Sequence, residues 1–272
     1  EQSKLDQEYK QAENNFNTIN SNIISLQHRK KMLEDMQREY EGFTGSVKRL
    51  LTDAENNANL KSKIVGVLAS LIKVPQIYQA AIEMALGNAV QNIVTHSDDG
   101  AKELINYLKQ REYGRVTFLP INTIKERYFD SSYRPLLKTA GVYGIASELI
   151  SYNDNISKVV SNLLGGTVIV DNMNTAISIA RQSRYSFRIV TLDGDVINPQ
   201  GSITGGSKKS QVANLLSREA DIESSAKAID KLIAEKNQVI KLMEQLSTKL
   251  TAVNEIIKNK SNELRNVEIS LA

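Results

Sequence analysis

The chain has 272 residues and a formal net charge of +3, with 34 Lys and Arg residues against 31 Asp and Glu. This length allows one or two domains, and so mild a charge means that any nucleic-acid binding must come from a local patch. Cysteine is absent from the sequence, which excludes a disulfide framework and a thiolate metal site. No apolar run approaches the roughly 20 residues that span a bilayer.

Glycine and proline, the residues that most readily interrupt helices, are confined to the middle of the chain. All 14 glycines and all 4 prolines lie between Gly42 and Gly206. We therefore expect an N-terminal helical arm at residues 1–41, a globule at residues 42–206 and a C-terminal helical arm at residues 207–272. The first residues continue a polar helical pattern and lack the order of a signal peptide, so we expect a piece of a longer protein.

The first arm carries apolar side chains at alternating steps of four and three. Such spacing keeps one stripe facing a partner helix, as in a coiled coil. The alternative is an amphipathic helix packed on the globule, but a helix of about 40 residues is about 60 Å long and would extend beyond it. The predicted seam is Leu5, Tyr9, Ala12, Phe16, Ile19, Ile23, Leu26, Lys30 and Leu33.

The second arm shows the same kind of stripe over a longer stretch. Its predicted seam is Ile222, Ala226, Ile229, Ile233, Lys236, Ile240, Met243, Leu246, Leu250, Val253, Ile257, Lys260, Leu264, Val267 and Leu271. Two successive steps of three around Met243 predict a local slip in register. Because both arms leave one globule, each is expected to pair with the other in antiparallel orientation. The far end of the longer second arm then lacks a partner within the chain.

Between the arms, predicted strands and helices alternate, which is typical of an α/β globule. Asp154 and the pair Ser97 and Asp98 are candidate helix caps. We expect strands at 90–94, 116–119, 167–170, 187–192 and 195–197, helices at 75–86, 98–108, 156–164 and 172–182, and a strand or short helix at 64–72. A polar stretch at about 121–140 is expected to connect two subdomains, at about 42–125 and about 141–206.

The segment at residues 201–210 (GSITGGSKKS) nearly matches a phosphate-binding P-loop, G-x-x-x-x-G-K-[ST]. Ser207 stands where that motif has its lysine, so Lys208 comes one residue late and would point elsewhere. A nucleotide-binding enzyme that uses this loop therefore stays only an alternative hypothesis. The glycines otherwise indicate a flexible exit loop or a surface where two backbones approach closely.

No catalytic or metal-binding constellation stands out. His28 and His96 lie far apart and lack the spacing of a zinc site. The aspartates at 98 and 99 are better explained by helix capping, and those at 193 and 195 by a turn. We accordingly expect the chain itself to have no enzymatic activity and to need no cofactor.

Basic side chains form three clusters near the predicted junctions of the arms with the globule. Runs of charge on helices are usually only solvated faces, but clusters that gather in space could contact phosphates without regard to sequence. The clusters are Arg29, Lys30 and Lys31, then Lys48 and Arg49, and finally Lys208 and Lys209.

Several motifs of the globule together resemble the hinge of a bacterial structural-maintenance-of-chromosomes (SMC) protein. They are ALG at 85–87 with QNIV at 91–94, GRVTFLP at 114–120, LGGTVIVD at 164–171, and TLDGDVINP at 191–199 followed by GSITGG at 201–206. Each motif alone is weak, but the combination is specific and covers the whole globule. A zinc hook of the Rad50 type, which also sits at a coiled-coil apex, is excluded because it requires cysteines.

The resemblance implies a mixed α/β, two-lobed hinge globule at the tip of an antiparallel intramolecular coiled coil, which forms a homodimer. It places Gly201, Gly205 and Gly206 at the dimer contact, although Gln200 stands where related hinges often have another glycine. It also implies weak, sequence-independent DNA binding at Lys208 and Lys209. ATPase heads with ATP and Mg²⁺, a kleisin-type subunit at those heads and a cytoplasmic, nucleoid-associated location are implied for the longer protein.

Overall fold

The computed structural model describes residues 1–206 and 213–271. Its internal contacts divide the chain into two units. The arm unit contains residues 1–34 and 221–272, and the globular unit contains residues 35–220. None of the described helices is both long and apolar enough to cross a membrane.

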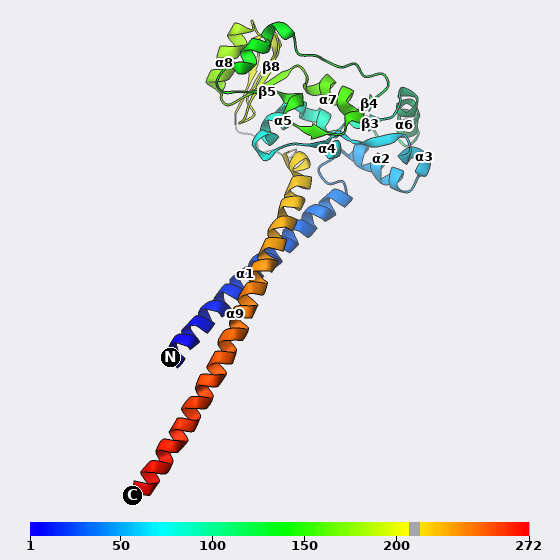
Figure 1. The fold of residues 1–272 in the computed structure, drawn as a ribbon. Helices are drawn as coiled ribbons and strands as arrows, with labels where there is room; N and C mark the ends of the chain where they lie inside the picture. The colour runs from blue at the N-terminus through cyan, green and yellow to red at the C-terminus, as the bar shows by residue number, and fades with distance from the viewer. Residues whose placement is uncertain (207–212, 272) are drawn as a thin grey trace. The chain divides into compact units, whose positions relative to one another are not determined.

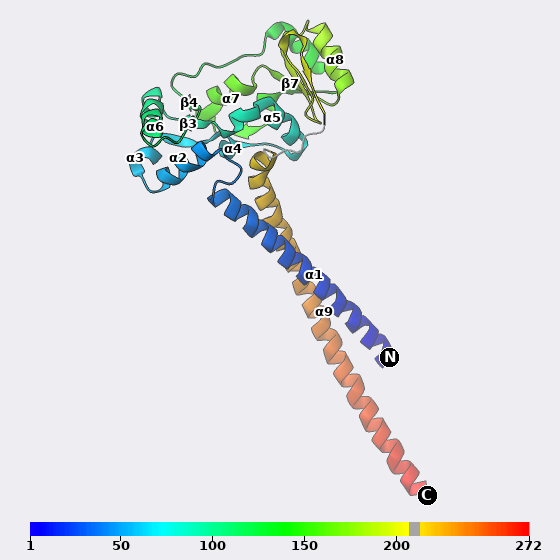
Figure 2. The same cartoon turned by 180° about the vertical axis from the view of Figure 1, so that it is seen from behind.

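In the arm unit, α1 (Gln2–Arg38) and α9 (Ala213–Leu271) lie side by side (Figures 1 and 2). Gln2 Nε2 donates to Asn254 Oδ1 at 2.7 Å, and Lys236 Nζ donates to Asn20 Oδ1 at 2.7 Å. Asn20 lies 18 residues after Gln2, and Asn254 lies 18 residues after Lys236. The two helices are therefore antiparallel and keep one register between these bonds, and every predicted seam position on α1 is at least partly buried.

The seam on α9 differs from the prediction. From Ile222 to Val253 only Ile233 of the predicted seam is exposed, while Ser225, Leu232 and Val239, which were not predicted, are buried or partly buried beside Ala226 and Ile240, which were. The predicted slip near Met243 stays a prediction, because Ile240, Met243 and Leu246, which follow one another at steps of three, are all at least partly buried. Leu232 packs with Ile19 and Ile23, whereas Ile233 is 40% exposed. Apolar residues are adjacent at 232–233 and at 239–240, so the sequence alone does not show which of each pair faces α1. Ser225 could not be predicted in the seam, because it is polar although it is buried.

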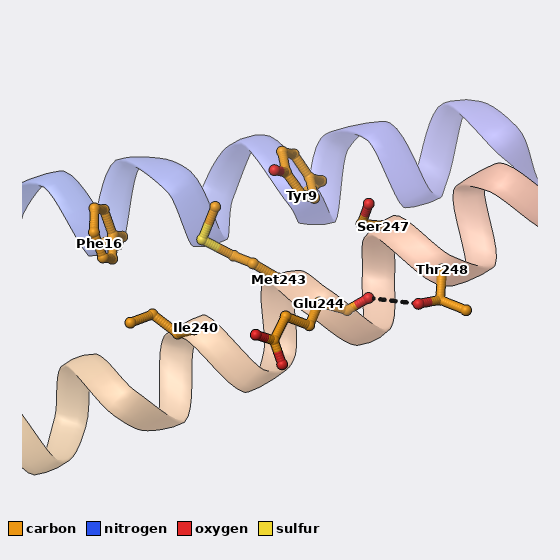
Figure 3. Close-up of a pocket in the computed structure, with 7 residues that line it drawn as sticks. All are labelled: Tyr9, Phe16, Ile240, Met243, Glu244, Ser247 and Thr248. Carbon is orange, nitrogen blue, oxygen red and sulfur yellow. Dashed lines mark hydrogen bonds between the residues drawn. The ribbon is translucent and has the colours of Figure 1, made fainter.

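Around Met243 the two helices leave a groove of about 530 Å³. Tyr9 and Phe16 of α1 face Ile240 and Met243 of α9 across it (Figure 3). The Lys236 ammonium lies 5.1 Å from the centroid of the Phe16 ring, in addition to its bond to Asn20. A cation–π contact and a hydrogen bond thus accommodate a charged side chain in an otherwise apolar seam.

Between residues 256 and 269 the apolar side chains of α9 are exposed, as expected for the longer arm. They include Ile256 (60% exposed), Ile257 (43%), Leu264 (61%), Val267 (52%) and Ile269 (67%).

The globular unit is mixed α/β, as predicted. A three-stranded sheet of order β1-β3-β4 comprises Ile64–Val67, Ile93–Thr95 and Phe118–Pro120, with β3 and β4 parallel. A five-stranded sheet of order β10-β9-β8-β7-β5 comprises Ile203–Thr204, Val196–Ile197, Arg188–Thr191, Thr167–Val170 and Val142–Ile145, with only β7 and β8 parallel. β2 (Ile72–Lys73) pairs with β6 (Ser151–Tyr152). This pair links the segment that forms the three-stranded sheet to the segment that forms the five-stranded sheet.

The α-helices of the globular unit are α2 (Gly45–Glu55), α3 (Ala58–Lys61), α4 (Leu68–Leu71), α5 (Gln79–Leu86), α6 (Asp98–Gln110), α7 (Ser157–Leu164) and α8 (Met173–Gln182). Short 3₁₀ helices include η1 (Gln76–Tyr78), η2 (Gly87–Gln91), η3 (Ser131–Lys138), η4 (Ala146–Glu148), η5 (Asp154–Ile156) and η6 (Pro199–Gly201).

The five-stranded sheet is covered on both faces. Val168 and Val170 of β7 pack with α8 in one hydrophobic cluster, while Ile169 belongs to the larger core that also contains residues of the first sheet. Figure 1 shows α8 beside the strands. Burial on both faces explains why β7 is a continuous apolar run without alternation.

Several predicted elements shift at their ends. The strand predicted at 90–94 begins at Ile93, because η2 occupies the preceding residues. Asn153 caps η5 where Asp154 was expected, through a bond from the amide of Asn155. Ser97 caps α6 as predicted, by accepting from the amide of Gly100 at 3.1 Å. β5 and β10 were not predicted at all.

Two arginines, Arg218 (buried) and Arg188 (half-buried), donate to carbonyl groups at the ends of helices. Arg218 of α9 is 4% exposed and donates to the carbonyls of Met36 (3.2 Å) and Glu41 (2.9 Å), where α1 ends. Arg188 of β8 donates to the carbonyls of Ala85 (2.7 Å) and Met84 (3.1 Å) in the last turn of α5. Carbonyls in the last turn of a helix lack intrahelical partners, and a cation there is favourable.

The corrected seam predicts that Leu232→Ala destabilises the arms by about 1–2 kcal/mol because it removes partly buried apolar surface. Ile233→Ala, the matched control one residue along the helix, is expected to change stability by less than about 0.5 kcal/mol. Thermal unfolding followed by circular dichroism measures both. Equal losses, or a larger loss for Ile233→Ala, would contradict the register described above.

Candidate dimerisation edge

β10 is the outermost strand of the five-stranded sheet. Ile203 pairs with Ile197 and Thr204 with Val196, both on β9. In the described part of the chain no strand pairs with the other side of β10. Both of its residues are exposed, and Ile203 is 56% exposed. An open edge of this kind presents unpaired backbone groups to another strand.

The three glycines predicted at a dimer contact flank this strand. Gly201 has φ +100° and Gly206 has φ +126°, which are conformations that glycine adopts without strain. Before them, Gln200 has φ 72° although it is not glycine, and its amide donates to the carbonyl of Tyr185 at 3.1 Å. The backbone at position 200 thus has a left-handed conformation, which glycine adopts more readily than glutamine.

Gly205 is required for a different reason. A Cβ at this position would lie 2.4 Å from Oδ1 of Asp195, and the same oxygen accepts from the amide of Gly206 at 3.3 Å. The tight turn between β8 and β9 holds Asp195, because its amide donates to Thr191 Oγ1 at 3.0 Å and its carbonyl accepts from the Thr191 amide at 2.9 Å. The carboxylate therefore fixes the end of the edge strand, and a side chain at position 205 would displace it.

The predicted basic clusters are distributed over different parts of the chain. Arg29, Lys30 and Lys31 lie on α1 in the arm unit, where Lys30 pairs with Glu34 at 2.6 Å. Lys48 and Arg49 lie on α2 in the globular unit. Lys208 and Lys209 lie outside the described residues. That these clusters gather into one patch stays a prediction.

The backbone does not favour the P-loop alternative. A P-loop continues from its second glycine directly into a helix, and its first glycine follows a strand. Here Gly201 is the last residue of η6 rather than following a strand, and β10 lies between Gly201 and Gly205. Among the described residues, no group of three or more His, Asp or Glu side chains could hold a metal ion.

Comparison with known proteins identifies the fold. Residues 61–180 match the family model of the SMC proteins flexible hinge domain. The crystal structure of an asymmetric dimer of the Geobacillus stearothermophilus SMC hinge domain superposes with a TM-score of 0.79 at 32% identity, over 92% of this chain and 100% of that one. The chain belongs to the SMC hinge family. The Pyrococcus furiosus SMC hinge with an extended coiled coil is 29% identical, with a TM-score of 0.51 over 98% of this chain and 91% of that one.

Curated relatives of this SMC hinge are much longer proteins. Chromosome partition protein Smc of Clostridium kluyveri is 33% identical over 95% of this chain, and that of Bacillus subtilis is 35% identical over 90%. The hinge spans 22% and 20% of their respective lengths.

The contact of Gly205 with Asp195 predicts that Gly205→Ala costs about 1–3 kcal/mol, because the new methyl group overlaps the carboxylate. Adding Asp195→Ala removes the overlap, so the double variant is expected to be more stable than Gly205→Ala. Gly45→Ala is the control, since nothing lies within 4 Å of a Cβ there. Urea unfolding of the unmodified chain, Gly205→Ala, Asp195→Ala, the double variant and the Gly45→Ala control measures the coupling. Additive losses would contradict the contact.

Proposed function

We propose that this hinge joins two SMC chains into a homodimer, with β10 of one copy adding to an edge strand of the other. The open edge of β10 is the observation that carries the proposal. Backbone hydrogen bonds between edge strands supply affinity in such associations, and the exposed side chains supply specificity. The similar Geobacillus stearothermophilus hinge, which is described as a dimer, supports the homodimer.

The small residues around β10 suit such a pairing. Gly201, Gly205 and Gly206 place no side chain between the edge and an approaching backbone. The contact between Asp195 and Gly206 holds the end of the strand before a partner arrives, so less conformational entropy is lost on binding. A dimer with closed two-fold symmetry uses the same surfaces on both copies and leaves neither edge open.

The parent protein is proposed to be an ATPase that acts in chromosome condensation and segregation. Its relatives are named chromosome partition proteins, and the hinge corresponds to about a fifth of their length. In this proposal the hinge is the joint of a ring or V and has no catalytic role. ATP, Mg²⁺ and a kleisin-type subunit belong to the heads, and the protein works in the cytoplasm on the nucleoid.

Contact with DNA is the second part of the proposal. Lys208 and Lys209 follow the edge strand in sequence, and Arg29, Lys31, Lys48 and Arg49 are further candidates. Lys30 is a weaker candidate because its ion pair with Glu34 reduces its attraction for phosphate.

Dimerisation through β10 predicts that Ile203→Glu raises the dimer dissociation constant at least about tenfold, because it places a carboxylate in the edge contact on each copy. Ile77→Glu is the matched control, since Ile77 is 54% exposed and Ile203 is 56% exposed. Sedimentation equilibrium at micromolar concentration measures the mass of each protein. An unmodified chain that is only monomeric would overturn the proposed dimer, and equal effects of both substitutions would overturn the role of β10.

The DNA contact predicts that Lys208→Glu/Lys209→Glu weakens binding to a duplex and makes it less sensitive to salt, because phosphate contacts are lost. Mobility shifts at low and moderate salt measure this, with sedimentation as a check that the variant still dimerises. Binding that responds to neither the substitutions nor the salt would contradict the contact.

A further inference from the structure

A compact group of two tyrosines, two arginines and one aspartate lies on the globular unit, at a distance in sequence from the glycine edge. We call it the Arg–Tyr cluster: Arg49 and Asp53 of α2, Tyr107 of α6, and Arg111 and Tyr113 of the turn after α6. The hydroxyl groups of Tyr107 and Tyr113 both donate to Oδ2 of Asp53, each at 2.8 Å. This shared carboxylate fastens the end of α6 to α2.

Each arginine lies over one of the two rings. The guanidinium carbon of Arg49 is 5.6 Å from the centroid of Tyr113, and that of Arg111 is 5.5 Å from the centroid of Tyr107. The rings contact each other edge to face, with centroids 6.3 Å apart. The cluster is thus a continuous row of guanidinium, ring, ring and guanidinium. Cation–π contacts limit the freedom of both arginines before any ligand binds.

Arg49 is not neutralised by the carboxylate nearest to it in sequence. Arg49 and Asp53 are four residues apart on α2, a spacing at which opposite charges on a helix surface commonly pair. No ion pair of Arg49 or Arg111 occurs among the described residues, and both side chains are exposed. The two tyrosine hydroxyls occupy Asp53 instead, and these bonds raise the pKa of both phenols. The tyrosines therefore hold the Asp53 carboxylate in hydrogen bonds, without an ion pair to Arg49.

We propose that the Arg–Tyr cluster joins Arg49, one of the candidates for DNA contact, with Arg111 in one site that binds phosphates of the DNA backbone and is separate in sequence from Lys208 and Lys209. A guanidinium presents a planar fork of donors that suits phosphate oxygens, and two such groups are held here on one rigid surface. The rings are covered by the arginines and by each other, so bases do not stack on them and binding is independent of sequence. The inference rests on the proposed contact of the hinge with DNA.

The tyrosines act as positioning residues in this site. Replacing both with phenylalanine keeps the rings beneath the guanidinium groups but frees Asp53 to pair with Arg49. Nucleic-acid affinity should then fall even though no cationic group has been removed. Adding Asp53→Asn should restore it, because no carboxylate is left to neutralise Arg49. A purely structural role of the tyrosines does not predict this restoration.

The test measures binding of a fluorescein-labelled DNA duplex of mixed sequence to the complete chain by anisotropy at several salt concentrations. Arg49→Ala/Arg111→Ala is expected to weaken binding about tenfold at low salt and to lower the slope of log K against log salt by about two, one for each phosphate contact. Arg134→Ala/Lys158→Ala removes the same charge from exposed side chains elsewhere in the globular unit and is expected to leave the slope unchanged. Tyr107→Phe/Tyr113→Phe should weaken binding, and Asp53→Asn in that background should restore it.

The outcomes separate this site from the proposed function. If the unmodified chain binds no duplex at low salt, the proposed DNA contact and this site both fail, while the dimer is judged by its mass alone. If the duplex binds and Lys208→Glu/Lys209→Glu weakens it, but Arg49→Ala/Arg111→Ala acts like the control, only this site is overturned. If polyglutamate of matched charge bound as tightly as the duplex, an acidic polypeptide would be the favoured ligand of the cluster. The assignment of nucleic acid as its ligand would then be overturned. Thermal unfolding and sedimentation confirm that each variant is folded and dimerises as the unmodified chain does.

Discussion

The hydrogen bonds of Arg218 hold together the two places where the chain enters and leaves the globular unit. Its side chain is almost completely buried, and both terminal nitrogens donate to backbone carbonyls at or just after the end of α1, while Nε has no partner among the described residues. Burial lowers the pKa of this guanidinium and the charge of Glu41 opposes that effect, but an arginine in a protein stays charged at any physiological pH. A buried cation without partners would be very costly, so the end of α1 and the start of α9 must stay adjacent. Two helices that pair in antiparallel orientation require this adjacency at their junction with a globule.

Arg188 applies the same chemistry inside the globular unit. Its hydrogen bonds join strand β8 of the five-stranded sheet to the last turn of α5. In the chain, α5 lies between β1 and β3, which belong to the three-stranded sheet. In both cases the donors are side chains and the acceptors are backbone carbonyls at a helix end. The identity of the residue that supplies such a carbonyl hardly matters, and sequence patterns therefore reveal neither contact. The arms and the lobes are predictable from periodicity, but the bonds that fasten them are not.

Periodicity predicted the arms well where apolar residues stood alone, and failed at the adjacent pair Leu232 and Ile233. Leu232 and Ile233 fit the hydrophobic stripe equally well in sequence, and only the packing against Ile19 and Ile23 distinguishes them. The buried strand β7 was predictable because both of its faces are apolar. β10 was not, because a strand of two residues is defined by its pairing with β9 and by the contact between Asp195 and Gly206. The glycines marked this segment as unusual in the sequence, but only the resemblance to SMC hinges indicated a dimer contact. Only the tertiary structure showed that these glycines flank the edge strand β10 of the five-stranded sheet.

The Arg–Tyr cluster illustrates the opposite relation between sequence and structure. Here the local pattern is clear, since Arg49 and Asp53 have the spacing of an ion pair within one helix. A surface ion pair of this kind contributes little to stability, typically less than about 1 kcal/mol. Two tyrosine hydroxyls from another element can therefore compete for the carboxylate, and they do so through two hydrogen bonds and an aromatic contact. The arginines remain exposed, with charge available for a ligand. A weak local interaction has given way to tertiary contacts, and the result is a cationic surface that the charge pattern of α2 alone would not predict.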